Sequence, residues 1–233
     1  MVALDMAGKT FPERVRAQTF SAFEWVLGHR RYLLAAAVGL VLAAGALGLW
    51  WWRAGQREGV AGRALAEVNQ TFRQQHPAGF YLPGGEATEA KPEALIQRYQ
   101  QVADQFRGTR AAAEALLRAA HLEYSAGLYD AAIRDYDRYV ERRRAPFRAT
   151  ALLGRGYALE AKGDLAKAAA AFGLAAEAAG PDPVAAEAYL AQGRTLEALQ
   201  KREEARRAYG LVAERFPQSS WAVRAAERLA TLQ

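Results

Sequence analysis

Residues 116–140 read LLRAAHLEYSAGLYDAAIRDYDRYV, and the same pattern returns at residues 152–176 (LLGRGYALEAKGDLAKAAAAFGLAA) and 189–213 (YLAQGRTLEALQKREEARRAYGLVA). Each copy predicts two helices joined by a turn. The first helix carries a small residue midway, at Ala120, Gly156 or Gly193, and the turn contains Gly127, Gly163 or Gln200. The second helix carries an alanine and, four residues later, an aromatic residue: Ala132 and Tyr136, Ala168 and Phe172, Ala205 and Tyr209.

This pattern predicts an all-α fold in which paired helices stack. Alanine or glycine lets two antiparallel helices approach closely, and we expect the aromatic side chain to fill the space toward the next pair. A single pair cannot bury its apolar face alone, so neighbouring pairs must stack into an α-solenoid. We expect the solenoid to occupy residues 92–233 and to end in a capping helix, Trp221 to Leu232, whose apolar side is formed by Ala222, Ala225 and Leu229.

The spacing and the small–small–aromatic triplet resemble the tetratricopeptide repeat, and Pro217 falls where that family often ends its second helix. The resemblance implies a protein-binding groove lined by the first helices. Its groove positions correspond to His121, Tyr124, Tyr157, Glu160, Arg194 and Glu197. Some members of the family hold a C-terminal carboxylate with a lysine and an asparagine, but Leu117 and His121 stand at those positions here, so that mode is not expected.

A membrane-proximal helix and a loop are expected at residues 53–91. Helical character continues past Trp52 to about Gln75, with an apolar stripe at Val60, Ala64, Val68 and Phe72. Two prolines and three glycines then predict a surface loop at residues 76–91. Phe80 and Tyr81 in this loop either pack against the neighbouring helix or contact a partner. The helices on either side of the loop can form a fourth, degenerate pair.

Residues 32–52, YLLAAAVGLVLAAGALGLWWW, contain no charge and no proline. As a helix this stretch matches a hydrocarbon core of about 30 Å. Arginines lie just outside it, and tryptophans mark its end, as is typical of a membrane interface. We therefore predict a single transmembrane helix. A buried helix of a soluble protein and a cleaved signal peptide, with Ala44-Gly45-Ala46 as the cleavage site, are the alternatives.

The charges that flank this stretch predict its orientation. Five basic residues precede it and three follow closely: Lys9, Arg14, Arg16, Arg30 and Arg31, against Arg53, Arg57 and Arg63. The positive-inside rule places residues 1–31 as a short cytoplasmic segment, either an interfacial helix or ordinary lead-in sequence. The repeats would then lie in the periplasm of a double-membraned bacterium, with the protein in the inner membrane.

No motif in the sequence points to catalysis, so we expect a non-enzyme. There is no phosphate-binding loop, no Gly-x-Ser-x-Gly motif and no metal-binding spacing of the three histidines. We therefore expect no catalytic residues, no metal, no cofactor and no small-molecule substrate. The formal net charge of +6 is spread along helices whose charges alternate in sign, which does not favour a nucleic-acid partner.

The order of the apolar span and the repeats along the chain indicates a more specific function. The span with its flanks, GHRRYLLAAAVGLVLAAGALGLWWWR, followed by the repeats, resembles the YfgM-like ancillary subunits of the bacterial Sec translocon. That resemblance implies a non-catalytic adaptor that lies beside the Sec channel subunits and links translocated chains to periplasmic chaperones. Two alternatives remain: an envelope scaffold in outer-membrane assembly or cell division, and a membrane-anchored accessory subunit of a redox or maturation complex.

Overall fold

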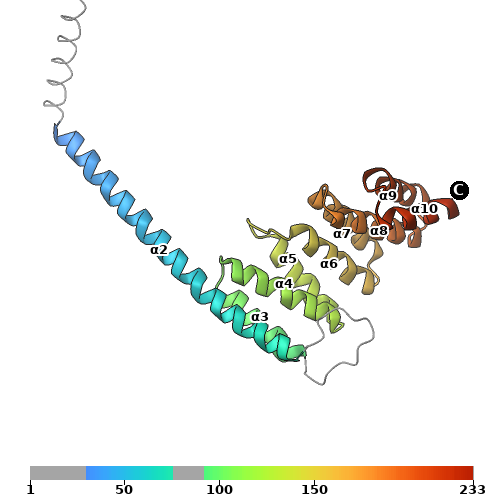
Figure 1. The fold of residues 1–233 in the computed structure, drawn as a ribbon, viewed down its shortest axis with the longest axis horizontal. Coiled ribbons are helices and arrows are strands. Elements are labelled where there is room, and N and C mark those ends of the chain that lie inside the picture. The colour runs from blue at the N-terminus through green and yellow to red at the C-terminus, as the bar shows by residue number, and fades with distance from the viewer. Residues whose placement is uncertain (1–29, 76–91, 233) are drawn as a thin grey trace, which may run out of the picture. The chain divides into compact units, whose positions relative to one another are not determined.

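The computed structural model describes residues 30–75 and 92–232, and within these ranges the chain forms nine helices and no strand (Figure 1). The predicted all-α fold is confirmed. The expectations for residues 1–29 and for the loop at 76–91, including Phe80 and Tyr81, lie outside the described residues. The helices are α2 (Arg30–Gln75), α3 (Pro92–Gln105), α4 (Arg110–Ser125), α5 (Tyr129–Val140), α6 (Arg148–Ala161), α7 (Leu165–Ala179), α8 (Pro183–Ala198), α9 (Arg202–Arg215) and α10 (Ser220–Thr231).

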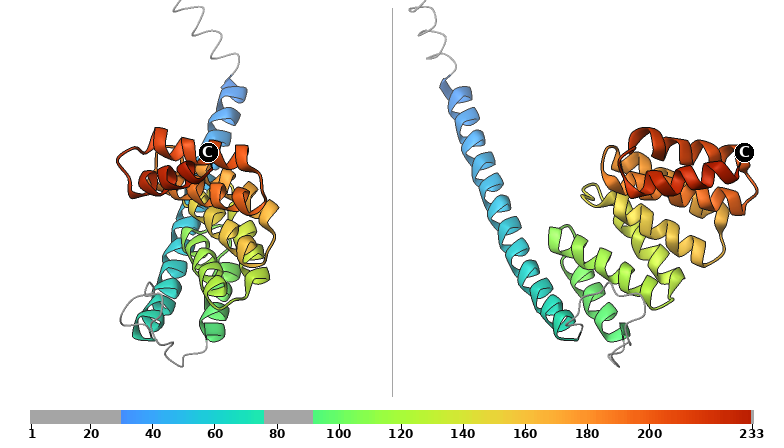
Figure 2. Two further views of the ribbon diagram at one scale, coloured as in Figure 1. Left: turned by 90° about the vertical axis from the view of Figure 1, so that its right-hand side faces the viewer. Right: turned by 45° about the vertical axis from the view of Figure 1, so that its right-hand side comes forward.

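The chain divides into two compact units, Met1–Gln56 and Arg57–Gln233. In the second unit each helix from α3 to α9 packs against the next one along the chain, and α10 packs against both α9 and α8 (Figure 2). The helices α4, α6 and α8, which open the three repeats, also contact one another in turn. This is the stacked arrangement of helix pairs that the sequence predicts.

The end of α2 belongs to this second unit and pairs with α3. Ala61, Leu65 and Val68 of α2 are buried in the same core as Leu95 and Tyr99 of α3. The Tyr99 hydroxyl donates a hydrogen bond to Asn69 Oδ1 at 2.8 Å. A fourth helix pair therefore precedes the three repeats.

The apolar stripe predicted on this part of α2 is confirmed at Ala64, Val68 and Phe72, which lie in or against the core, but it is wrong at Val60. Val60 is 45% exposed, and the buried positions are Ala61, Leu65 and Val68, with Phe72 partly buried. Steps of four residues advance by 400° on a helix of 100° per residue, so a strict four-residue series drifts around the helix. The observed spacing of four, three and four residues keeps the side chains on one face.

Close glycine–aromatic contacts hold the second and third repeats together. The ring of Phe172 lies against Gly156, and the ring of Tyr209 lies against Gly193, so each aromatic packs on the first helix of its own pair. The sequence predicts that these rings fill the space toward the next pair. The ring of Tyr136 lies against Gly154 of the following repeat, and it also meets His121 of its own pair. The alanines at 132, 168 and 205 are fully buried, as predicted.

The three predicted turns share one backbone conformation. Gly127, Gly163 and Gln200 have φ angles of 77°, 86° and 60°, and Gln200 is the one non-glycine residue with positive φ among the described residues. Side chains resist this left-handed conformation, which explains glycine at the first two turns. The third repeat makes the same turn with a residue that is strained there.

Several helices begin at residues that cap their first turn. Thr109, Asp182 and Ser219 accept hydrogen bonds from the backbone N–H groups of α4, α8 and α10. Pro183 follows Asp182 in the first turn of α8, where a missing N–H costs nothing. Ala222 and Ala225 of α10 are buried, and Leu229 packs against the same core, as expected for the predicted capping helix.

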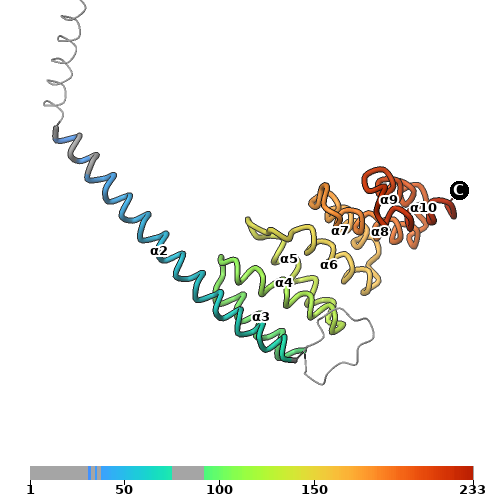
Figure 3. Tube along the Cα trace, in the orientation of Figure 1, coloured from blue at the N-terminus to red at the C-terminus, as the bar shows by residue number. Residues whose placement is uncertain are grey.

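The first unit contributes the apolar part of α2, which Figure 3 traces from residue 30 onward. Its large apolar side chains are exposed, for example Leu40 at 72% and Trp51 at 74%. By length and composition α2 can cross a membrane: within Val38–Gln74 the mean hydropathy of an 18-residue window reaches 1.2, and none of that window is buried. Among the described helices it alone meets this condition.

Candidate protein-binding residues

The six residues predicted to bind a partner lie on α4, α6 and α8, two on each helix. These helices contact each other in succession, so the fold brings the six residues onto one series of neighbouring helices. We call them the first-helix set: His121, Tyr124, Tyr157, Glu160, Arg194 and Glu197. Their side chains differ in how many contacts they already make within the chain.

Glu160 and Arg194 form an ion pair between the second and third repeats. Arg194 donates from Nε and Nη2 to the two oxygens of Glu160, at 3.3 and 2.7 Å. The buried Thr195 hydroxyl adds a hydrogen bond to Glu160 Oε1 at 3.2 Å. Because this fork joins two oxygens to one guanidinium, it fixes both side chains more firmly than a single contact would.

Glu197 has a similar role at the end of the array. It accepts a hydrogen bond from the Tyr209 hydroxyl at 2.5 Å and is bound by Arg228 of α10 through Nε and Nη2 at 2.8–3.0 Å. Burial, followed by the hydrogen bond to Glu197, raises the pKa of Tyr209. Glu197 therefore connects the glycine–aromatic contact of the third repeat to the capping helix.

Tyr157 is anchored at both ends of its side chain. Its ring meets the ring of Phe172 edge-on, with centroids 5.1 Å apart, and its hydroxyl donates to Glu187 Oε1 at 2.8 Å. Burial, followed by the hydrogen bond to Glu187, raises the pKa of Tyr157. This tyrosine is therefore part of the packing between α6, α7 and α8.

His121 and Tyr124 make fewer contacts within the chain than the other four residues of the set. His121 lies edge-on to Tyr136 with ring centroids 5.6 Å apart, and burial lowers its pKa. Tyr124 packs against Tyr129 at 5.9 Å and is half-buried, and burial raises its pKa. Within the part of the chain that the structure describes, neither side chain makes a hydrogen bond. These two residues thus retain polar atoms that a ligand can use.

Sequence reasoning missed the hydrogen-bond partners of the first-helix set, which are Glu187, Thr195, Tyr209 and Arg228. The sequence did contain a signal for the contact between two members of the set. Glu160 and Arg194 lie 34 residues apart, close to the repeat length, and opposite charges at that offset indicate a link between successive repeats.

A buried acidic cluster between α3, α4 and α5 was also missed. Glu123 is 2% exposed and Asp135 is 4% exposed, and the Gln100 amide donates to both, at 2.8 and 3.1 Å. Arg138 pairs with Asp135 at 2.8 Å, but Glu123 Oε2 is buried with no hydrogen-bond partner among the described residues. Burial, with the nearby Asp135, raises the pKa of Glu123 to about 7.

Comparison with known proteins supports the repeat assignment. Models of the tetratricopeptide repeat match residues 117–183 and 187–219. No curated protein matches the chain. Among the described residues, no three His, Cys, Asp or Glu side chains gather as a group that can hold a metal ion.

The two matched ranges cover the helix pairs α4–α5, α6–α7 and α8–α9, in which the repeated glycine–aromatic contacts and turns are found. Tetratricopeptide repeats are protein–protein interaction modules, and the proteins that carry them are generally non-catalytic scaffolds. The chain therefore contains a tetratricopeptide-repeat domain, a domain for binding other proteins.

Proposed function

We propose that the chain is a non-catalytic single-pass adaptor of the bacterial inner membrane, with a cytoplasmic N-terminus and a periplasmic repeat domain. Its more specific role would be that of an ancillary Sec translocon subunit that links translocated chains to periplasmic chaperones. One observation carries the proposal: the same chain contains an apolar helical segment with no buried residue in its most apolar window and a protein-binding repeat array. Apolar surface of that extent is stable in lipid and costly in water.

The membrane topology can be tested because the sequence contains no cysteine. Single-cysteine variants Ser21→Cys and Ser125→Cys report the two sides of the apolar segment. In spheroplasts, a membrane-impermeant maleimide should label Ser125→Cys at once and Ser21→Cys only after lysis. Equal labelling of both, or recovery of the protein in the soluble fraction, would reject the topology.

Partner identity is tested by photocrosslinking in the membrane. A photoreactive amino acid at Leu40 reports neighbours of the apolar segment, and one at the exposed Ser125 reports ligands beside Tyr124. We expect Sec channel subunits from the first position, and translocating chains or chaperones from the second. A probe at the exposed Val223 of α10 is the control. Crosslinks to outer-membrane assembly, division or redox components, without Sec subunits, would contradict the proposed role.

The first-helix set gives a residue-level test of binding to any partner identified in this way. Tyr124→Phe removes a hydroxyl that makes no hydrogen bond among the described residues, so it should weaken binding several-fold and leave the unfolding temperature unchanged. Glu160→Gln disrupts the fork with Arg194, so it should lower the unfolding temperature. If Tyr124→Phe binds as the wild type does, the predicted contact is absent.

A further inference from the structure

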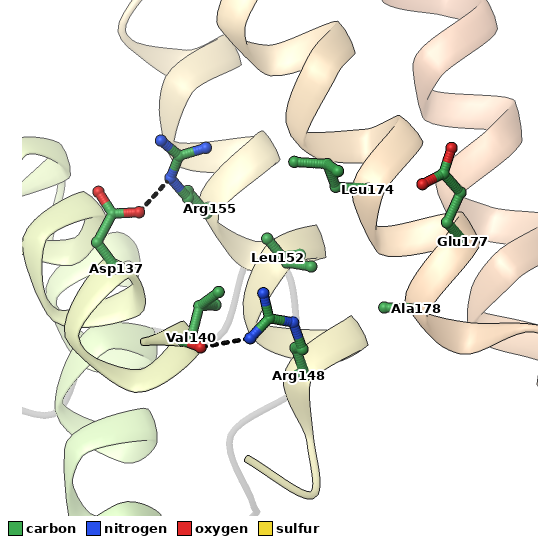
Figure 4. Close-up of a pocket in the computed structure, with 8 residues that line it drawn as sticks. All are labelled: Asp137, Val140, Arg148, Leu152, Arg155, Leu174, Glu177 and Ala178. Carbon is green, nitrogen blue, oxygen red and sulfur yellow. Dashed lines mark hydrogen bonds and ion pairs between the residues drawn. The ribbon is translucent and has the colours of Figure 1, made fainter. Parts of the chain in front are cut away.

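A second surface of the repeat domain, separate from the first-helix set, has the features of a peptide-binding site. A cavity of about 510 Å³ opens between α5, α6 and α7 (Figure 4). That volume lies within the range of about 300–1,000 Å³ that ligand pockets occupy. No member of the first-helix set lines it.

The cavity has an apolar floor and wall. Leu152 of α6 is 5% exposed, Leu174 of α7 is 51% exposed, and Val140 and Ala178 complete the apolar lining. Figure 4 shows Leu152 between α5 and α7, with Leu174 above it on the neighbouring helix. An apolar side chain of a ligand can pack against the recessed Leu152 and the exposed Leu174 at the same time.

Arg155 lines the same cavity with hydrogen-bonding capacity to spare. Its Nε lies 2.6 Å from Asp137 Oδ1 as an ion pair, but the geometry of the N–H is not that of a hydrogen bond. Among the described residues its guanidinium makes no hydrogen bond, although the side chain is only 23% exposed. A guanidinium with unused donors beside apolar surface binds a carboxylate well, because two parallel N–H groups match its two oxygens.

The loop that borders the cavity is strongly basic. Residues 141–148, ERRRAPFR, contain four arginines and one glutamate. Arg143 and Arg144 are exposed and pair with no carboxylate in the described part of the chain, and Arg148 lines the cavity itself. Phe147, 56% exposed, adds apolar surface to the loop. Positive charge therefore exceeds negative charge in this loop, whose ends, at Val140 and Arg148, line the cavity.

We propose that this surface binds an acidic peptide segment of a partner protein. One large apolar side chain of the segment enters the cavity over Leu152 and Leu174, and its flanking carboxylates meet Arg155, Arg143 and Arg144. Charge complementarity selects an acidic partner, and the recessed floor selects a peptide over a lipid surface, which offers no single side chain to fill a cavity.

The test uses the full chain in uncharged detergent micelles and a fluorescein-labelled peptide, Gly-Asp-Glu-Phe-Leu-Glu-Asp-Gly, followed by fluorescence anisotropy. We expect saturable binding that weakens at least fivefold when salt rises from 50 to 300 mM. Replacing Phe-Leu in the peptide by Ser-Ser, or its acidic residues by Asn and Gln, should each weaken binding at least tenfold.

Variants of exposed residues connect the binding to this surface. Leu174→Asp should weaken binding at least tenfold, and Arg143→Ser/Arg144→Ser at least fivefold. The matched controls change exposed residues elsewhere: Val223→Asp for the leucine, and Arg202→Ser/Arg224→Ser for the arginines. Circular dichroism verifies that every variant keeps its helices.

Four outcomes would overturn the proposal. The peptide fails to bind, or it binds the Leu174 and arginine variants as tightly as their controls. Alternatively, vesicles containing phosphatidylglycerol bind through Arg143 and Arg144 while the peptide does not, which would assign the surface to lipid. A loss of binding in Tyr124→Phe with no loss in Leu174→Asp would also place the peptide on the first-helix set and reject this site.

Discussion

Gly193 lies so close to the ring of Tyr209 that a β-carbon at residue 193 would come within 2.5 Å of the ring atom Cε1. The ring cannot move away freely, because Tyr209 is fully buried and its hydroxyl is bound to Glu197. The absence of a side chain at residue 193 therefore sets the distance between α8 and α9.

Gly193→Ala should destabilise the domain. Overpacking a rigid core costs about 1–3 kcal/mol, and the gain in helix propensity is about 1 kcal/mol. We expect the overpacking cost to lie near the upper end, about 3 kcal/mol, because an entire buried ring must shift, and this leaves a net loss of about 2 kcal/mol. Gly210→Ala in α9 is the matched control, since nothing lies within 4 Å of its added β-carbon, and it should stabilise. Urea unfolding followed by circular dichroism measures both, and equal stabilisation of the two variants would contradict the proposed contact.

The strained turn at Gln200 predicts a stabilising substitution. Gln200 has the positive φ that glycine supplies at the equivalent turns, and a residue with a side chain loses about 1–2 kcal/mol in that conformation. Gln200→Gly should therefore raise the free energy of unfolding by about 1 kcal/mol. The reciprocal variant Gly163→Gln should lower it by a similar amount, since both positions are exposed and no packing changes. The two variants must change the free energy of unfolding in opposite directions. A loss of stability in both would reject backbone strain at Gln200 as the explanation.

Glu123 predicts a distinctive pH dependence. A carboxyl group whose pKa is raised by folding stabilises the fold fully below its unfolded pKa, here 4.5, and that contribution is lost as pH rises through about 7. The loss is about 3 kcal/mol, from about 1.4 kcal/mol per pKa unit. Glu123→Gln removes the titration. The variant should match the wild type near pH 4.5 and exceed it in stability by up to that amount at pH 8.

The comparison between the two proteins isolates Glu123 from other titrating carboxylates, such as Asp104, whose pKa is lowered by Arg107 and Arg138 despite some burial. Urea unfolding at a series of pH values gives the difference directly. A difference that does not grow between pH 4.5 and 8 would show that Glu123 is not held protonated in the fold.

Glu58 connects the end of α2 to the beginning of the first repeat. Its two carboxylate oxygens accept hydrogen bonds from the backbone N–H groups of Arg110 and Ala111 at 3.0–3.2 Å, where α4 begins. A negative charge at a helix N-terminus contributes about 1 kcal/mol. Glu58→Ala should therefore lower stability by about that amount and increase hydrogen exchange in the first turn of α4. Glu67→Ala on an exposed face of α2 should change neither, and equal behaviour of the two variants would remove this role from Glu58.

The repeat architecture was predictable because its determinants are local and recur. Glycine at residues 127 and 163, the buried alanines and the following aromatics each report a backbone or packing requirement within one pair of helices. The alignment of the repeats predicts that Gln200 lies at the turn of the third repeat, and its positive φ angle confirms this.

The remaining features depend on contacts between distant segments. The burial of Glu123 requires Gln100 on α3 and Asp135 on α5 to meet at α4, and no local pattern encodes that meeting. The direction of Phe172 and Tyr209 toward their own pair was likewise decided by Gly156 and Gly193, which leave room on that side. The six predicted binding residues share one series of helices, but their internal hydrogen bonds were not visible in the sequence.

The links Glu160–Arg194 and Glu197–Arg228 have a consequence for how any ligand would be held. A ligand that carries a guanidinium or a carboxylate would displace one member of such an ion pair, so one intramolecular contact would break as the ligand contact forms. The net electrostatic free energy gained by this exchange is small. The selectivity of binding would therefore come from the shape and the apolar part of the ligand, and the ligand would dissociate quickly.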